Sequence, residues 1–213
     1  MQHDASVIKS APARLIYLIG PSGSGKDSLI NASRMQLSDA GIKVARRVIT
    51  RSAEASGEAA QSVSEEQFAQ LRNEGAFAMH WRANGLSYGI PNEVGQWLAQ
   101  GCSVLVNGSR AYLPSARQRY PNLLAVCIDV QPSVLRERLL SRGRETLEQV
   151  DQRLARSVEL QLEAGQGVHH IDNSGQLSTA VVALLELLRR EHLIPEGPGK
   201  NLQGDERLQH DRS

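Results

Sequence analysis

The sequence predicts an α/β fold in which helices wrap a mainly parallel sheet. Short apolar runs typical of buried strands alternate along the chain with stretches of helical periodicity. A glycine-rich segment at residues 20–28 joins the first apolar run to the first helical stretch. The chain has 213 residues, 40% of them hydrophobic, which suits one such domain with a small insert and argues against two full domains.

The expected elements follow one another in a simple order. Apolar runs of strand type predict four main strands, at residues 15–19, 44–50, 103–106 and 123–130. Helical spacing of apolar residues predicts four main helices, which run from about 26, from 132 to Arg142-Gly143-Arg144, from 147 to 163 and from 178 to 190.

The segment from about 52 to 92 interrupts this rhythm. Small and acidic residues come first, and a short helix at 64–73 and an aromatic stretch at 77–88 follow. We interpret the segment as an insert that covers the edge of the sheet.

Composition and charge limit where the protein works and what it binds. Residues 1–13 and 195–213 lack an apolar pattern and are expected to be flexible, which leaves a folded domain at 14–194. The 24 Lys+Arg and 23 Asp+Glu give a formal net charge of +1, which argues against nucleic acid or an anionic membrane as an obligatory partner. No membrane span or leader is expected, and Cys102 and Cys127 lie in apolar strand-like runs, which suits buried thiols in the cytoplasm without a disulfide.

The strongest motif is Gly20-Pro21-Ser22-Gly23-Ser24-Gly25-Lys26-Asp27-Ser28, which fits the phosphate-loop pattern G-x-x-x-x-G-K between a strand and a helix. Its glycines allow positive φ, so that successive N–H groups converge on phosphate oxygens, and the helix N-terminus adds partial positive charge. Lys26 is expected to bridge the β- and γ-phosphates of ATP. The alternative is a glycine-rich turn with a solvated lysine.

The residue after the lysine departs from the general motif. Asp27 stands where Ser or Thr normally binds Mg²⁺, and Ser28 follows it. Because Mg²⁺ accepts carboxylate and hydroxyl oxygens, we expect Asp27 and Ser28 to hold it. The alternative for Asp27 is an acidic residue that favours the first helical turn. A second metal position is missing, since the strand at 103–106 is followed by Asn107 instead of Asp.

The order of motifs resembles the guanylate kinase family over about residues 14–190. After the phosphate loop the shared elements are Thr50-Arg51, Gly57-Glu58, Val63-Ser64 before a helix with Phe68, Tyr88-Gly89, and Arg138-Leu139-x-x-Arg142-Gly143. The resemblance implies a P-loop NTPase with a three-layer fold, an acceptor-binding insert at about 52–92 and an arginine lid at about 138–150.

The side chains with which guanylate kinases read guanine are missing. His80 stands where their Glu precedes Trp81, Glu54 replaces a second arginine, and Asn107 replaces an Asp. A neutral histidine offers at most one acceptor nitrogen to guanine, which makes GMP a poor acceptor.

The phosphate-holding features are retained, and finer details resemble one branch of the family. These details are Asp27 after the loop lysine and the segments Ala83-Asn84-Gly85-Leu86-Ser87-Tyr88-Gly89 and Leu105-Val106-Asn107-Gly108-Ser109-Arg110. They resemble the ribose 1,5-bisphosphate phosphokinase family, which is associated with bacterial phosphonate breakdown. The resemblance implies γ-phosphoryl transfer from ATP to the 1-phosphate of ribose 1,5-bisphosphate, giving 5-phosphoribosyl 1-diphosphate. The alternatives are a guanylate or other nucleoside monophosphate kinase, and a non-catalytic guanylate-kinase-like module that binds a protein partner.

The remaining site residues are assigned on this resemblance. The expected substrate contacts are Arg47, Arg51, Tyr88, Asn107 and Arg153. The expected lid arginines, which neutralise charge during transfer alongside Lys26, are Arg138, Arg142 and Arg144. Solvent-exposed charge for the arginines, core packing for Tyr88 and a turn at Asn107-Gly108 stay open as alternatives. The oligomeric state is also open, a homodimer included.

Overall fold

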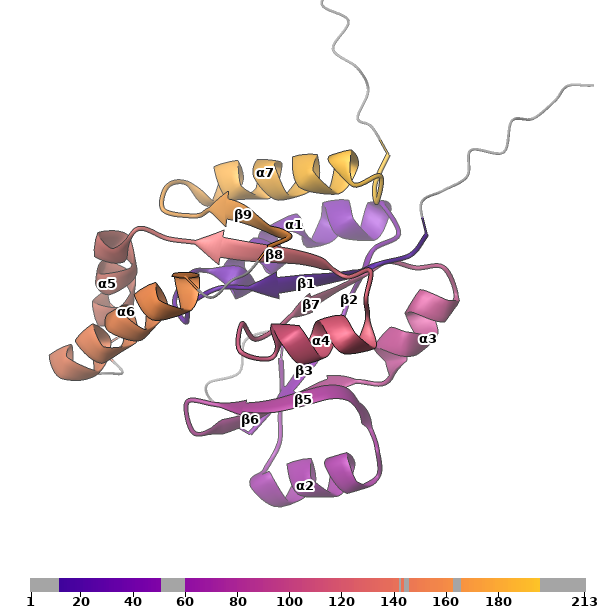
Figure 1. Cartoon of the computed structure of the whole chain (residues 1–213), viewed down its shortest axis with the longest axis horizontal. Helices are drawn as coiled ribbons and strands as arrows, with labels where there is room; N and C mark the ends of the chain where they lie inside the picture. The colour runs from indigo at the N-terminus through magenta and orange to yellow at the C-terminus, as the bar shows by residue number, and fades with distance from the viewer. Residues whose placement is uncertain (1–11, 51–59, 142, 144–145, 163–165, 196–213) are drawn as a thin grey trace, which may run out of the picture.

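The computed structural model describes residues 12–50, 60–141, 143, 146–162 and 166–195 (Figure 1). A five-stranded sheet forms its centre, in the order β2-β7-β1-β8-β9, and every neighbouring pair is parallel. The strands are β1 (Leu15–Ile19), β2 (Lys43–Val44), β7 (Val104–Asn107), β8 (Leu124–Asp129) and β9 (Val168–Asp172). The predicted α/β fold with a mainly parallel sheet is confirmed.

Helices cover both faces of this sheet, which makes three layers (Figure 1). The helices α1 (Lys26–Asp39) and α7 (Leu177–Arg190) pack on one face, while α3 (Glu93–Ala99) and α4 (Leu113–Arg119) contribute to the core on the other. Alternate residues of β1 serve the two cores, with Ile16 and Leu18 on the α1 side and Tyr17 and Ile19 on the other. Burial on both faces explains why β1 is apolar at every position.

A second, four-stranded sheet lies beside the first, in the order β4-β3-β6-β5. Its strands are β3 (Arg47–Ile49), β4 (Ala60–Ser62), β5 (Phe77–Ala83) and β6 (Leu86–Pro91). The prediction of one strand at 44–50 is therefore wrong: β2 ends at Val44 in the main sheet, and β3 begins three residues later in the second sheet. The insert builds a sheet of its own with β3 and does not merely cover an edge.

The helix α2 (Glu65–Asn73) packs beside the second sheet and begins where the sequence indicates. Ser64 is its N-cap, and a reciprocal pair of hydrogen bonds with Gln67 forms a capping box. Phe68 is buried on this helix and stacks on Phe77 of β5, with ring centroids 4.8 Å apart.

Two further helices, α5 (Pro132–Ser141) and α6 (Leu147–Leu162), pack on each other beyond the carboxyl ends of β1 and β8 (Figure 1). Leu135, Leu139 and Val150 bury their side chains in a small separate core. Because these helices have their own core, the segment stands apart from the three layers. None of the helices in the described part of the chain is long and apolar enough to cross a membrane.

Several elements were not predicted, namely α3, α4, β4, β5, β6 and β9. Each is short or carries few consecutive apolar residues, so local pattern alone does not reveal it. Cys102 also differs from expectation, because it lies, partly buried, in the segment between α3 and β7 and not in a strand. Cys127 is buried in β8 as predicted, and both thiols are free.

Candidate active site

The phosphate loop lies between the end of β1 and the start of α1, at the carboxyl edge of the parallel sheet. This is the edge where open α/β sheets bind ligands. Gly25 has φ of 85°, and a Cβ there would lie 2.5 Å from Asn173 Nδ2. A Cβ on Gly20 would lie 2.6 Å from the Ile128 carbonyl oxygen. Only glycine fits at either position, so neighbouring strands hold the loop closely.

Lys26 places its ammonium group inside the loop. Its Nζ donates hydrogen bonds to the carbonyl oxygens of Gly20 at 2.8 Å and Pro21 at 2.9 Å. The pKa of Lys26 is lowered to about 8, mainly by burial; Asp27 opposes this shift, and the positive charges of Arg47 and Arg110 add to it. A buried cation among other cations favours an anionic ligand, because that ligand supplies the missing opposite charge.

This depressed pKa predicts a pH dependence. Lys26 is charged below about pH 8 and loses its charge as the pH rises through that value, so the affinity of the loop for a nucleoside triphosphate should fall above pH 8. Calorimetric titration from about pH 7 to about pH 9.5 measures this affinity. We expect Lys26→Met to bind more weakly and with a smaller loss above pH 8. Equal slopes in the two proteins would contradict the assignment.

The same pKa has a consequence for folding. The unfolded lysine titrates near 10.5, so between about pH 8 and 10.5 the unfolded chain binds more protons than the folded one. Lys26 therefore makes the free energy of unfolding rise with pH in that window, and its burial costs stability below pH 8.

Asp27 is the centre of a polar network at the start of α1. The Asn107 side chain donates from Nδ2 to Asp27 Oδ1 at 2.7 Å, and Arg47 Nη2 lies 3.5 Å from the same oxygen. The Asp27 side chain is 59% exposed, whereas Asn107 is buried and its Oδ1 has no hydrogen-bond partner among the described residues. An exposed carboxylate beside an unpartnered amide oxygen is a donor set of the kind that Mg²⁺ accepts.

The far wall of the site is aromatic and cationic. Trp81 and Tyr88 face each other across the β5–β6 pair and stack with ring centroids 5.6 Å apart. The guanidinium carbon of Arg47 lies 5.4 Å from the centre of the Tyr88 ring. The ring orients the guanidinium without neutralising it, and the one described carboxylate near it in the cleft is Asp27, 3.5 Å from its Nη2.

Together these groups line one cleft of about 490 Å³. It runs from the phosphate loop to the second sheet and includes Ser28, Ser109 and Arg110. Asp27 is the single carboxylate among the described lining residues, which include four cations, Lys26, Arg47, Arg110 and Arg153. The cleft is therefore suited to strongly anionic ligands.

His80 does not line this cleft. Side chains alternate along β5, so Trp81 and Ala83 border the cleft, while the exposed His80 lies with Glu65 and Arg72 of α2 in a separate hollow.

The helices α5 and α6 bring arginines to the phosphate loop. Arg138 lies close to Gly25, where an added Cβ would be 3.9 Å from its Nη1, and that nitrogen is buried without a hydrogen bond among the described groups. Arg153 donates to Ser22 Oγ at 3.1 Å, so the structure places it at the loop. Arg51, Arg142 and Arg144 lie outside the described residues.

Asn173 is hydrogen-bonded to the phosphate loop. It is buried just after β9, and its Nδ2 donates to the Ser24 carbonyl oxygen at 2.7 Å. Asn173 therefore holds the phosphate loop in place, a role that sequence reasoning did not assign to it. Trp81 as a wall of the cleft was also missed, although a hairpin turn at Asn84-Gly85 would have paired it with Tyr88.

Comparisons with known proteins agree with one another. The family model for guanylate kinase matches residues 12–191. The ribose 1,5-bisphosphate phosphokinase PhnN of Pseudomonas paraeruginosa is 59% identical over 175 residues, covering 82% of this chain and 95% of that protein. The PhnN of Pseudomonas fluorescens is 56% identical over 183 residues, covering 84% and 96%.

A solved structure supports the fold. The crystal structure of guanylate kinase from Anaplasma phagocytophilum matches with a TM-score of 0.57 at 19% identity, covering 85% of this chain and 88% of that one. The family model and the curated relatives extend over nearly the whole described chain. The chain belongs to the guanylate kinase family and, within it, to the group of the ribose 1,5-bisphosphate phosphokinases PhnN.

Proposed function

We propose that this protein is an ATP-dependent ribose 1,5-bisphosphate phosphokinase. It transfers the γ-phosphoryl group of ATP to the 1-phosphate of α-D-ribose 1,5-bisphosphate and releases ADP and 5-phosphoribosyl 1-diphosphate. One observation carries the proposal from the structure: the cleft joins a phosphate loop to a wall with cations and aromatic rings, and its one described carboxylate, Asp27, is engaged by Asn107 and Arg47. Because no other described carboxylate of the cleft can accept hydrogen bonds from the N–H groups of guanine, the cleft suits a phosphorylated sugar better than guanine.

The protein's part in phosphoryl transfer is to position the two substrates and to neutralise negative charge on the transferred group. The attacking oxygen belongs to a phosphate whose second pKa is about 6, so it is ionised at neutral pH and needs no general base. Lys26 lies where it can neutralise charge on the transferred group, and Arg138 is close enough to Gly25 to do the same. Arg142 and Arg144 complete this set in the proposal.

Asp27 and Ser28 hold Mg²⁺ in this proposal, with the amide oxygen of Asn107 beside them. A bound Mg²⁺ supplies positive charge to the nucleotide phosphates. Asp27 provides the carboxylate, and Asn107 fixes it through the 2.7 Å hydrogen bond to Oδ1.

Arg47, Arg51 and Tyr88 bind the acceptor phosphate in this proposal. Replacing Arg47 by Ala should raise the KM for ribose 1,5-bisphosphate at least about tenfold, since one charge-assisted hydrogen bond contributes about 1.5–3 kcal/mol. Steady-state kinetics at saturating ATP measure this. Arg46 is a matched control, because it is the adjacent arginine, is exposed, and has its one hydrogen bond among the described groups with the Ala60 carbonyl oxygen. Equal KM values for the two variants would contradict the role of Arg47.

The function itself is tested by offering both acceptors to one preparation. A coupled assay of ADP release, run with ribose 1,5-bisphosphate and with GMP, should give a kcat/KM at least about 100-fold higher for the sugar, as a site that lacks a required hydrogen-bond partner discriminates on that order. Faster turnover of GMP would identify a nucleoside monophosphate kinase. Failure to bind ATP at all would leave a non-catalytic module.

A further inference from the structure

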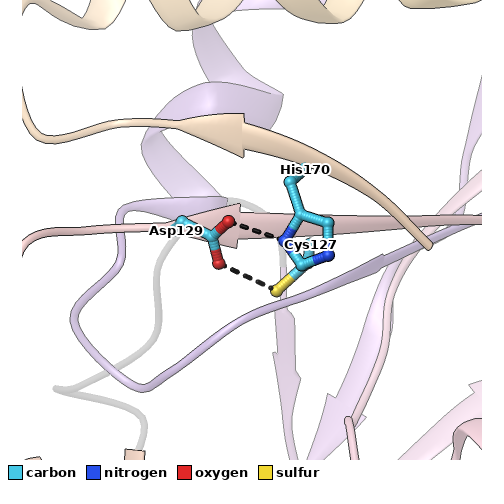
Figure 2. Close-up of side chains that lie close together, drawn as sticks. All are labelled: Cys127, Asp129 and His170. Atoms are coloured by element: carbon cyan, nitrogen blue, oxygen red, sulfur yellow. Dashed lines mark hydrogen bonds and ion pairs between the residues drawn. The ribbon is translucent and has the colours of Figure 1, made fainter. Parts of the chain in front are cut away.

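A second group of reactive side chains lies outside the cleft, between β8 and β9. Figure 2 shows Cys127, Asp129 and His170 with their polar atoms turned toward one another. The Cys127 Sγ lies 3.3 Å from Asp129 Oδ1, and His170 Nδ1 lies 2.7 Å from Asp129 Oδ2. One atom of each side chain lies within 4.8 Å of the others.

The sheet itself creates this arrangement. Cys127 and Asp129 are two residues apart on β8, so their side chains leave the same face. His170 is the register partner of Cys127 on the parallel neighbour β9 and shares that face. Three ligand types are thus presented from two adjacent strands, a rigid frame of the kind that metal sites need.

We propose that Cys127, Asp129 and His170 form a binding site for Zn²⁺ or a similar borderline transition-metal ion, separate from the Mg²⁺ of the kinase reaction. The donor set is one sulfur, one carboxylate oxygen and one imidazole nitrogen, which suits zinc and excludes a site built for Mg²⁺ or Ca²⁺. Zinc bonds of about 2.0–2.3 Å place tetrahedral ligand atoms roughly 3.3–3.8 Å apart, a spacing that small side-chain rotations from the present positions reach.

The partial exposure of His170 and Asp129 would let an ion reach the site from solvent. The side chain of His170 is 49% exposed and that of Asp129 26% exposed, whereas Cys127 is buried beneath them. The ion therefore meets imidazole and carboxylate first, and solvent provides a fourth ligand. Burial and Asp129 raise the pKa of the Cys127 thiol to about 12, so binding must release the thiol proton to solvent.

Titration of the full-length, untagged protein tests the proposal. After treatment with a chelator and in the absence of nucleotide, competition with a chromophoric zinc indicator should show one tight equivalent of Zn²⁺. Substitution with Co²⁺ should give a sulfur-to-cobalt charge-transfer band, because the thiolate is a ligand. Zinc should also raise the Tm of the protein, since it binds only the folded state with this geometry.

Variants separate this site from other zinc-binding groups. His170→Gln and Asp129→Asn change partly exposed side chains and should each weaken Zn²⁺ binding at least about tenfold, as metal-site changes commonly do. Cys127→Ser should abolish the cobalt band. The matched controls are His169→Gln, the next residue on β9, and Cys102→Ser, the other thiol, and both should bind like the wild type.

Three results would overturn the proposal. They are the absence of a tight equivalent of Zn²⁺, a Co²⁺ complex without a sulfur band, and His170→Gln binding as tightly as His169→Gln. Each of these results would show that Cys127, Asp129 and His170 do not form a metal site together. The kinase proposal is unaffected by these outcomes, because the assay with ribose 1,5-bisphosphate and GMP tests it separately.

Discussion

Replacing Lys26 by Ala should lower kcat by about 10²–10³-fold, the loss seen when one preorganised charge stabiliser is removed from a transition state. Its Nζ is held inside the phosphate loop by the carbonyl oxygens of Gly20 and Pro21, where the transferred phosphoryl group would lie. Steady-state kinetics with ribose 1,5-bisphosphate and ATP measure the effect. Because burial of the charged lysine costs stability, the Tm should not fall, and the loss of rate can be read as loss of catalysis.

Lys43→Ala is the control for this experiment. Lys43 is an exposed lysine of β2 and does not line the cleft, so its removal should leave kcat within about twofold, as surface changes usually do. Near-wild-type turnover of Lys26→Ala would remove the phosphate loop from the mechanism.

Exchanging the residue types at positions 27 and 107 should transfer the metal-binding carboxylate from one position to the other. The general P-loop arrangement has Ser or Thr after the lysine and an Asp at the end of a neighbouring strand, whereas this chain has Asp27 and Asn107 at the two positions. Their side chains are hydrogen-bonded at 2.7 Å, so they occupy one place. We expect Asp27→Ser alone to lower kcat about 100-fold and the double variant Asp27→Ser/Asn107→Asp to recover at least about tenfold.

A readout other than rate separates the metal from a structural effect. Calorimetry should show that Mg²⁺ strengthens ATP binding in the wild type and in the double variant, and less so in Asp27→Ser. Asp39→Ala is the control, because Asp39 is an exposed carboxylate of the same helix, at its other end. If the double variant binds and turns over no better than Asp27→Ser, the proposed exchange of ligands is wrong.

Local features of this molecule could be predicted from sequence, and features set by distant contacts could not. The loop glycines, the start of α1 at Lys26 and the cap at Ser64 follow from neighbours within a few residues. The apolar run at 44–50 led to the wrong prediction of one strand. Apolar residues indicate a strand but not the sheet to which it belongs, and the chain passes from one sheet to the other after Val44.

Contacts between distant residues were also unpredictable within the candidate site. The lysine and the carboxylate after it belong to a motif, so their place was evident from sequence. The stack of Trp81 on Tyr88 depends on hairpin register, and the position of Arg153 at Ser22 depends on how two helices pack. The packing of the helices leaves no trace in local composition, whereas the hairpin that pairs Trp81 with Tyr88 has a turn signal at Asn84-Gly85. His80 shows the converse, since strand alternation turns it away from the cleft that its neighbour Trp81 lines.

The bond between Asn173 and Ser24 has a consequence for biosynthesis. It joins residues 149 positions apart in the chain, and a further hydrogen bond links the Asn173 N–H to the Asp129 carbonyl oxygen. A nascent polypeptide emerges from the ribosome with its N-terminus first. The loop residues therefore appear long before Asn173, whose side chain anchors them. The phosphate loop therefore gains its Asn173 anchor only after residue 173 has been made, and a chain terminated before that residue lacks this anchor even when most of the sheet has been made.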